Sequence, residues 1–186
     1  MRGYRYAAAL GLALPLAAQA AQIQAVDVRH DGDRYQVDMD VRLDAPPARA
    51  FAVFADYARL PEINPAVRVA RIIERDGART RLYTEVHACV ALFCKTMRET
   101  QDMLAEPDAH GGRLSAEVLP QSSDFRYGRA EWNFTGSGAT TQLRLHMQME
   151  PAFWIPPLIG PWLVERSLRA EAERTSAGIE RLAHTP

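Results

Sequence analysis

The sequence predicts an α+β fold in which an antiparallel sheet packs against one long C-terminal helix. Three observations predict it: runs of alternating apolar and polar residues, short glycine-containing turns between them, and an apolar stripe at helical spacing near the end of the chain. Strands joined by short turns pair antiparallel. An amphipathic helix must bury its apolar side, and the sheet is the layer available to cover it.

Strand character is clearest between Tyr35 and Leu43. Every second residue there is apolar and the residues between them are polar, which is typical of a strand with one buried and one solvated face. The same alternation, with turns at 76–77, 111–112 and 136–138, predicts further strands. Their expected ranges are 23–28, 67–74, 79–88, 94–104, 113–119, 125–134 and 142–149.

The first helix is predicted where Pro46-Pro47 ends the strand alternation. Proline is tolerated in the first turn of a helix, and Phe51 and Phe54 follow at helical spacing. Pro61 and Pro65 should end this helix with at most a short turn between them, because proline lacks the N–H that a helix interior requires.

A single long helix is predicted from Pro161 to Leu182. Apolar residues recur along it at spacings of three and four, and charged residues occupy the opposite side. The stripe that should pack against the sheet comprises Val164, Leu168, Ala172, Thr175, Ile179 and Leu182.

The segment APPARAFAVFADYARLPEINPAV, from Ala45 to Val67, resembles the opening of the START-like superfamily. It leads from a strand through a Pro-Pro helix to two proline breaks before the next strand. The branch that it most resembles is the polyketide cyclase/dehydrase and coenzyme Q-binding group. The predicted meander and C-terminal helix extend the resemblance over most of residues 21–186.

This resemblance implies a helix-grip fold, in which a curved antiparallel sheet wraps around the final helix and leaves a hydrophobic cavity between them. Members mostly bind hydrophobic small molecules such as lipids, sterols, quinones or polyketides, and a minority are enzymes. The chain departs from the pattern in an extra strand at 23–28 and in a long stretch rich in proline and tryptophan, Pro151–Trp162. Fold alone does not fix function.

Residues 1–20 have the pattern of a cleaved secretory signal peptide. Two arginines precede an apolar run from Ala7 to Ala18, and cleavage is expected near Ala20. The mature chain is then predicted to be a single START-like domain of residues 21–186, located in the periplasm of a bacterium or secreted by it.

Charge and cysteine content limit the partners of the mature chain. Residues 21–186 contain 20 Lys and Arg and 23 Asp and Glu, so their net charge is slightly negative. Nucleic-acid binding usually requires an excess of basic residues, and none is present. Cys89 and Cys94 are expected to form a disulfide in an oxidising compartment. The two cysteines have no histidine pair near them in the sequence, as a zinc site would need, and their C-x4-C spacing differs from the C-x-x-C redox motif. No metal or cofactor is therefore expected. The sequence indicates no oligomeric state.

Strand alternation and the implied cavity together predict a ligand-binding set of inward-facing side chains. Methionines in this set would adapt to an irregular apolar ligand, and small residues would leave volume for it. For each member the alternative is ordinary core packing. The set is Phe54, Tyr57, Leu82, Val86, Met97, Glu99, Gln101, Arg126, Gly128, Trp132, Leu145, Met147, Trp154, Trp162 and Leu168.

Glu99 is the most informative member of this set. Its strand register places it inward with Met97 and Gln101, and an unpaired carboxylate inside a core is costly. Arg126 is inward in the same register and is the predicted partner of Glu99. Glu99 would then fix the polar end of an otherwise apolar ligand. The alternative is that both residues lie at the rim and are solvated.

The segment PAFWIPPLIGPW, from Pro151 to Trp162, is too short to span a bilayer and too rich in proline for a regular helix. By the fold prediction it lies at one end of the cavity, where it would act as a lid. Pro161 can occupy the first turn of the final helix, which would anchor Trp162 and leave Trp154 mobile. Two alternatives are packing into the core and transient contact with a membrane.

The predicted function is binding or transport of a hydrophobic small molecule, with catalysis as the alternative. An enzyme of the cyclase or hydrolase type would need an acid–base pair in the cavity, and no G-x-S-x-G, H-E-x-x-H or phosphate-loop motif is present. A protein–protein interaction module using the apolar segment is a further alternative. The titratable candidates for catalysis are Glu99, His87, Tyr127, His146 and Asp124.

Overall fold

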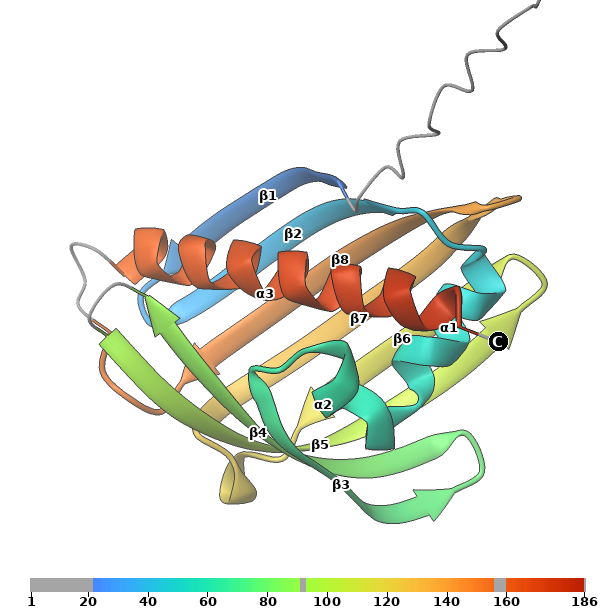
Figure 1. Cartoon of the computed structure of the whole chain (residues 1–186). Helices are drawn as coiled ribbons and strands as arrows, with labels where there is room; N and C mark the ends of the chain where they lie inside the picture. The colour runs from blue at the N-terminus through green and yellow to red at the C-terminus, as the bar shows by residue number, and fades with distance from the viewer. Residues whose placement is uncertain (1–21, 91–92, 156–159, 186) are drawn as a thin grey trace, which may run out of the picture.

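Eight antiparallel strands form one curved sheet around the C-terminal helix in the computed structural model, which describes residues 22–90, 93–155 and 160–185 (Figure 1). The order across the sheet is β1-β2-β8-β7-β6-β5-β4-β3. The strands are β1 (Gln22–Asp31), β2 (Arg34–Leu43), β3 (Val67–Asp76), β4 (Arg79–Val90), β5 (Phe93–Asp108), β6 (Gly111–Val118), β7 (Phe125–Ser137) and β8 (Thr140–Pro151).

One pairing in the sheet joins strands that are far apart in the sequence. β2 pairs antiparallel with β8, in register from Tyr35 opposite Met149 to Leu43 opposite Thr141. All other neighbours in the sheet are consecutive strands. The β2–β8 pairing therefore adds the β1–β2 hairpin to the six-strand meander and places it beside the strand that leads into the final helix.

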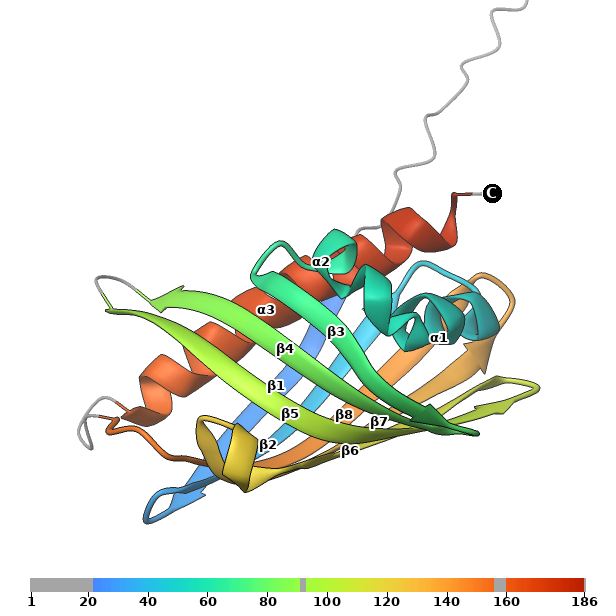
Figure 2. The ribbon, with the colours of Figure 1, turned by 90° about the horizontal axis from the view of Figure 1, so that it is seen from below.

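Three helices lie on the concave side of the sheet: α1 (Pro47–Ala55), α2 (Leu60–Ile63) and α3 (Gly160–Ala183). In Figure 2 α3 runs along the curved sheet, with α1 and α2 near its C-terminal end. Gly178 is required where α3 passes α2, because a Cβ at this position would overlap the carbonyl oxygen of Ile63. A side chain on residue 178 would push the two helices apart.

The hydrophobic core occupies the end of the molecule near α1. Phe134 of β7 is fully buried and meets the ring of Phe51 from α1 edge-on, at 5.9 Å between centroids. The C-terminal half of α3 adds Ile179 and Leu182 to this cluster. Because α1 and α2 cover only this end, the N-terminal half of α3 faces the sheet at the other end without a second layer between them.

The fold class and the predicted elements are confirmed, and most strands extend beyond their predicted ends. The extra strand at 23–28 is present as β1, and Pro61 lies in the first turn of the four-residue helix α2. The final helix contains Pro161 in its first turn, as predicted. Within the described part of the chain, no helix combines the length and hydropathy needed to cross a bilayer. The predicted signal peptide lies outside the described residues.

Candidate functional site

A cavity of about 500 Å³ lies between the sheet and the N-terminal half of α3. Its volume falls in the range of roughly 300–1,000 Å³ that is usual for small-molecule sites. The lining is mostly apolar and comes from β4, β5, β7, β8, the segment after β8, and α3. Its main apolar side chains are Met97, Phe125, Met147, Met149, Leu163 and Leu168.

Small residues on β7 provide the space for the methionines of β8. In the β7–β8 register Gly128 lies opposite Met149, and Ala130 lies opposite Met147. A Cβ on Gly128 would overlap a methyl group of Val118, so only glycine fits there without displacing its neighbour. The alternation of the sequence predicts these inward faces, and the structure agrees.

A smaller inner chamber of about 150 Å³ adjoins the main cavity. The two share Phe125, Met147 and Met149 as lining residues. The inner chamber adds Glu99 and Gln101 of β5. Arg129 and Gln148 also border it, but Arg129 pairs with Glu117 and Gln148 lies opposite Arg129 in the β7–β8 register. The site thus has an apolar outer volume and an inner volume bordered by polar residues.

Glu99 faces the inner chamber without a partner. Thr84 lies opposite it on β4, and no described side chain forms a hydrogen bond or ion pair with its carboxyl group. The part of Glu99 that protein atoms leave uncovered faces the chamber. Burial alone raises the pKa of Glu99 to about 7, because the ionised form loses its hydration. The inward orientation predicted for Glu99 is confirmed.

The predicted pairing of Glu99 with Arg126 is wrong. A β-bulge between Phe125 and Tyr127 shifts the register of β7 against β8, so Phe125 faces the cavity and Arg126 faces out. Arg126 is 56% exposed, donates a hydrogen bond to the Pro151 carbonyl at 3.3 Å and lies 3.8 Å from an oxygen of Asp33. The alternative, that these residues lie at the rim and are solvated, is correct for Arg126 but not for Glu99.

The mouth of the cavity is formed by the end of the β4–β5 hairpin and by the segment after β8. Phe153, Trp154 and Ile155 all contribute to its lining. The ammonium group of Lys95 lies 4.5 Å from the centre of the Phe153 ring and so bridges the two sides. Trp154 is 77% exposed although it borders the cavity. The remainder of the predicted lid, residues 156–159, lies outside the described residues.

Trp162 lies in the first turn of α3 and is 51% exposed. The guanidinium carbon of Arg166 lies 5.7 Å from the centre of the Trp162 ring. Trp162 does not belong to the lining of either chamber. The helical phase explains this, because Leu163 and Ser167 lie on the side of α3 that faces the cavity.

The structure divides the predicted ligand-binding set into three groups. Met97, Met147, Trp154 and Leu168 line the main cavity, and Glu99, Gln101, Gly128, Trp132 and again Met147 line the inner chamber. Arg126 and Trp162 are exposed instead. Five further members also lie outside both linings, since they pack in the core, against it or beside it: Phe54, Tyr57, Leu82, Val86 and Leu145.

Sequence reasoning missed the contribution of α3 next to its apolar stripe. Leu163, Ser167 and Glu171 line the cavity at a spacing of four residues, each one position before a member of the predicted stripe. A helical projection that included small and charged residues could have found them. Glu171 accepts a hydrogen bond from the Asn64 side chain at 2.7 Å, so its charge is engaged away from the ligand volume.

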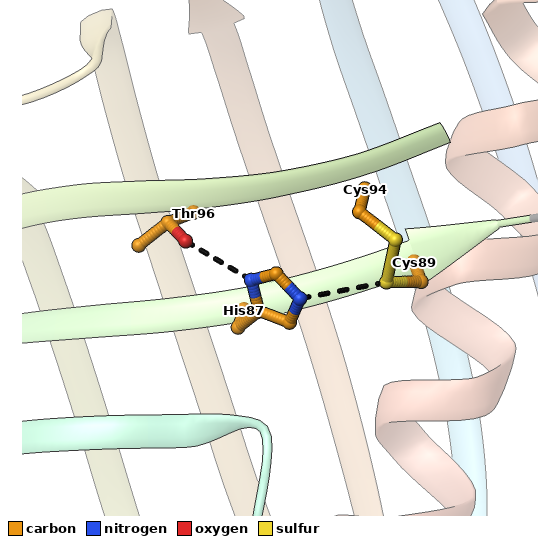
Figure 3. The surroundings of a disulfide bond; sticks show 4 residues. All are labelled: His87, Cys89, Cys94 and Thr96. Atoms are coloured by element: carbon orange, nitrogen blue, oxygen red, sulfur yellow. Dashed lines mark hydrogen bonds between the residues drawn. A yellow bond between two sulfur atoms is a disulfide. The ribbon is translucent and has the colours of Figure 1, made fainter. Parts of the chain in front are cut away.

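The predicted disulfide between Cys89 and Cys94 is present, and it joins directly opposed residues of the β4–β5 hairpin. Figure 3 shows His87 beside it, with Nδ1 3.0 Å from the Thr96 hydroxyl and Nε2 3.5 Å from the sulfur of Cys89. Because the two sulfurs are bonded to each other, this cluster offers no thiolate to a metal ion. Cys94 also lines the cavity, so the disulfide braces one side of the mouth.

Two other titratable candidates for catalysis, His146 and Asp124, do not lie beside Glu99. His146 is on the opposite face of the sheet, 2.7 Å from a carboxylate oxygen of Asp38. Asp124 accepts the backbone N–H of Arg98 at 2.8 Å. Neither residue lines the cavity or the inner chamber. Among the described residues Glu99 therefore has no second acid or base beside it.

Solved structures with similar folds include proteins of different roles. A STAR-related lipid transfer protein from Xanthomonas axonopodis is 13% identical with a TM-score of 0.67, covering 87% of this chain and 99% of that one. TTHA0849 from Thermus thermophilus is 24% identical with a TM-score of 0.63, covering 80% and 96%. The Zhui aromatase/cyclase from a Streptomyces species is 20% identical with a TM-score of 0.56, covering 81% and 91%. These likenesses are of fold.

The sequence itself identifies the family. No curated protein matches the chain. The family model described as polyketide cyclase / dehydrase and lipid transport matches residues 34–183, from the start of β2 to the end of α3. It thus spans seven of the eight strands and all three helices, and the START-like resemblance seen in the sequence is confirmed. The chain belongs to the polyketide cyclase / dehydrase and lipid transport family.

Proposed function

We propose that the protein holds or carries one hydrophobic small molecule in the cavity beneath α3. The observation that carries this proposal is the apolar volume of about 500 Å³, joined to an inner chamber with a single unpaired carboxyl group. Burying an apolar ligand there gains about 25 cal/mol for each Å² removed from water. The family supports the same class of ligand, since its description includes lipid transport.

The proposed mode of binding places the polar end of the ligand at Glu99 and its apolar part against the methionines. Met97, Met147 and Met149 have flexible, polarisable side chains that fit ligands of irregular shape. The ligand would enter between the β4–β5 hairpin and Phe153–Ile155, where the lining is apolar and Trp154 is free to cover it. This segment is the proposed lid.

Export of the protein is part of the proposal. The signal-peptide pattern of residues 1–20 motivates it, and a disulfide is the form of paired cysteines expected in an oxidising compartment. An apolar molecule crossing an aqueous compartment requires a carrier that shields it. Brief contact of the exposed Trp154 with a membrane during loading is compatible with this role.

A cyclase-type enzyme is the second candidate. One observation favours it: an acid whose pKa lies near 7 can both give and take a proton at neutral pH. The enzyme hypothesis also draws on the fold shared with an aromatase/cyclase. Among the described residues no second acid or base lies beside Glu99, since Glu171 of the main cavity accepts a hydrogen bond from Asn64 and Lys95 lies over Phe153. We therefore place binding ahead of catalysis.

The test is occupation of the cavity by a neutral apolar fluorophore, N-phenyl-1-naphthylamine, whose emission rises in apolar surroundings. Ser167→Trp would place an indole in the cavity, whereas Ala177→Trp adds the same side chain to the exposed side of α3. The expected result is binding to the wild type and to Ala177→Trp, and a loss of at least tenfold in affinity for Ser167→Trp. Equal binding by both variants would refute the proposed site.

A further inference from the structure

We infer that the polar group of the ligand is a neutral oxygen, a carbonyl or a hydroxyl, which accepts a hydrogen bond from the protonated carboxyl group of Glu99. An apolar molecule with an anionic head, such as a fatty-acid carboxylate, is then rejected from the inner chamber. This inference rests on the proposed function, because it specifies what the same cavity binds.

The residues that face Glu99 from the neighbouring strand and across the chamber are neutral. Thr84 faces it from β4, Gln101 follows it on the same side of β5, and Val118 and Gly128 close the chamber from β6 and β7. An oxygen of Glu99 lies 3.9 Å from the point where a Cβ of Gly128 would stand. A methyl group of Val118 fills the position of the missing Cβ, so Val118 and Gly128 form an apolar wall beside the carboxyl group. The room for a ligand group is the inner chamber of about 150 Å³ that Glu99 lines.

The charged side chains around the two chambers are engaged elsewhere. Lys95 lies at the mouth, over an aromatic ring. Glu171 on α3 accepts a hydrogen bond from Asn64, and Arg129 pairs with Glu117 at 2.8 Å on the opposite face of the sheet. Within the described part of the chain, Arg129 is the only cationic residue in the lining of the inner chamber. Its guanidinium group pairs with Glu117 and is not available to an anionic ligand there.

Three kinds of ligand head could meet the Glu99 carboxyl, and their costs differ. An anion would bury its own charge in the chamber without a cation, and it would also be repelled by Glu99 whenever that group is ionised. A cation would form an ion pair, but both ions would first have to lose their hydration. A neutral oxygen accepts a hydrogen bond from the O–H of the acid and buries no charge. Burial raises the pKa of Glu99 to about 7, so the acid form is well populated at neutral pH.

Binding through the acid form makes affinity depend on pH in a fixed direction. As pH rises above about 7, the carboxyl group of Glu99 ionises in the free protein. It must then take up a proton from solution before the ligand can bind, and this costs affinity. With a pKa of about 7, the protonated fraction falls about 100-fold between pH 6 and pH 9. The affinity for a ligand whose oxygen can only accept a hydrogen bond, such as a ketone, should fall by the same factor.

The experiment compares four ten-carbon probes by displacement of N-phenyl-1-naphthylamine: 2-decanone, 1-decanol, decanoate and decylammonium. For the wild type we expect 2-decanone and 1-decanol to bind at least tenfold more tightly than decanoate at pH 7. We also expect 2-decanone to weaken about 100-fold between pH 6 and pH 9. 1-Decanol should weaken less, because its hydroxyl can donate a hydrogen bond to the ionised carboxylate. Glu99→Gln should bind 2-decanone with no pH dependence, because an amide donates a hydrogen bond at every pH.

A matched control is Glu173→Gln, which removes a carboxyl group from the exposed side of α3 and should reproduce the wild-type profile. Equal binding of decanoate and 2-decanone would overturn the inference, and so would a preference for decylammonium that grows with pH. A flat pH profile for the wild type would overturn it as well. If the fluorophore itself does not bind, the proposed function fails, and the inference fails with it.

Discussion

Replacing Glu99 by glutamine should stabilise the protein, and the gain should appear only above acidic pH. Glu99 is buried against the inner chamber, and no described side chain donates a hydrogen bond to its carboxyl group or forms an ion pair with it. Its ionised form is therefore less stable in the folded protein than in the unfolded chain. Glutamine has nearly the same shape and carries no charge, so the substitution removes this penalty without creating a void.

The magnitude follows from the pKa of Glu99, which burial raises from 4.5 to about 7. Each pKa unit corresponds to about 1.4 kcal/mol, so the full penalty is up to about 3 kcal/mol. Below pH 4.5 the carboxyl is protonated in both states and no penalty exists. Between pH 4.5 and 7 the unfolded chain ionises first, and the stability of the wild type falls as pH rises. Above pH 7 both states are ionised and the penalty is complete.

The assay is urea unfolding of the wild type and of Glu99→Gln at pH 4.5 and at pH 8. The two proteins should differ by less than about 1 kcal/mol at pH 4.5, while the variant should be more stable by up to about 3 kcal/mol at pH 8. Glu173→Gln, on the exposed side of α3, should show neither effect. Parallel stability curves for the wild type and Glu99→Gln would refute the assignment of Glu99 as a buried, unpaired acid.

Three further predictions concern the fold. Gly178→Ala should destabilise the protein by about 1–3 kcal/mol in urea unfolding, because its Cβ would collide with the carbonyl oxygen of Ile63; an unchanged stability would mean that α2 moves freely. Tyr57→Phe should be neutral or stabilising by about 1 kcal/mol, since the Tyr57 hydroxyl is buried without a partner among the described residues, and a clear loss would reveal an unseen hydrogen bond. Reducing the Cys89–Cys94 disulfide should lower stability by about 2 kcal/mol, and a reductant that leaves the unfolding midpoint unchanged would contradict this.

Local patterns in the sequence were sufficient to predict the strands and helices and most of the side chains that face inward. Period-two alternation placed Met97 and Met147 on the cavity side, and the structure agrees. The same alternation brought Glu99 inward, although an acidic residue is unusual there. The spacing of the stripe from Val164 to Leu182 identified the buried side of the final helix.

The features that the sequence did not reveal depend on contacts between distant segments. The pairing of β2 with β8 is set by packing and not by any local motif. The bulge before Tyr127 reverses the orientation of Arg126, and no residue in that run signals an extra position in the strand. Trp162 faces solvent because the phase of α3 is fixed by its C-terminal half in the core.

The most direct test of the proposed site is an NMR titration of the methionine methyl groups with 2-decanone. Met97, Met147 and Met149 line the cavity, whereas Met39 and Met103 are buried in the core and serve as internal controls. Binding in the cavity predicts that the first three methyl signals shift with a common affinity while the two core signals stay in place. The proposed site would be contradicted if a saturating concentration of 2-decanone left the three cavity signals in place, or if it shifted only the core signals.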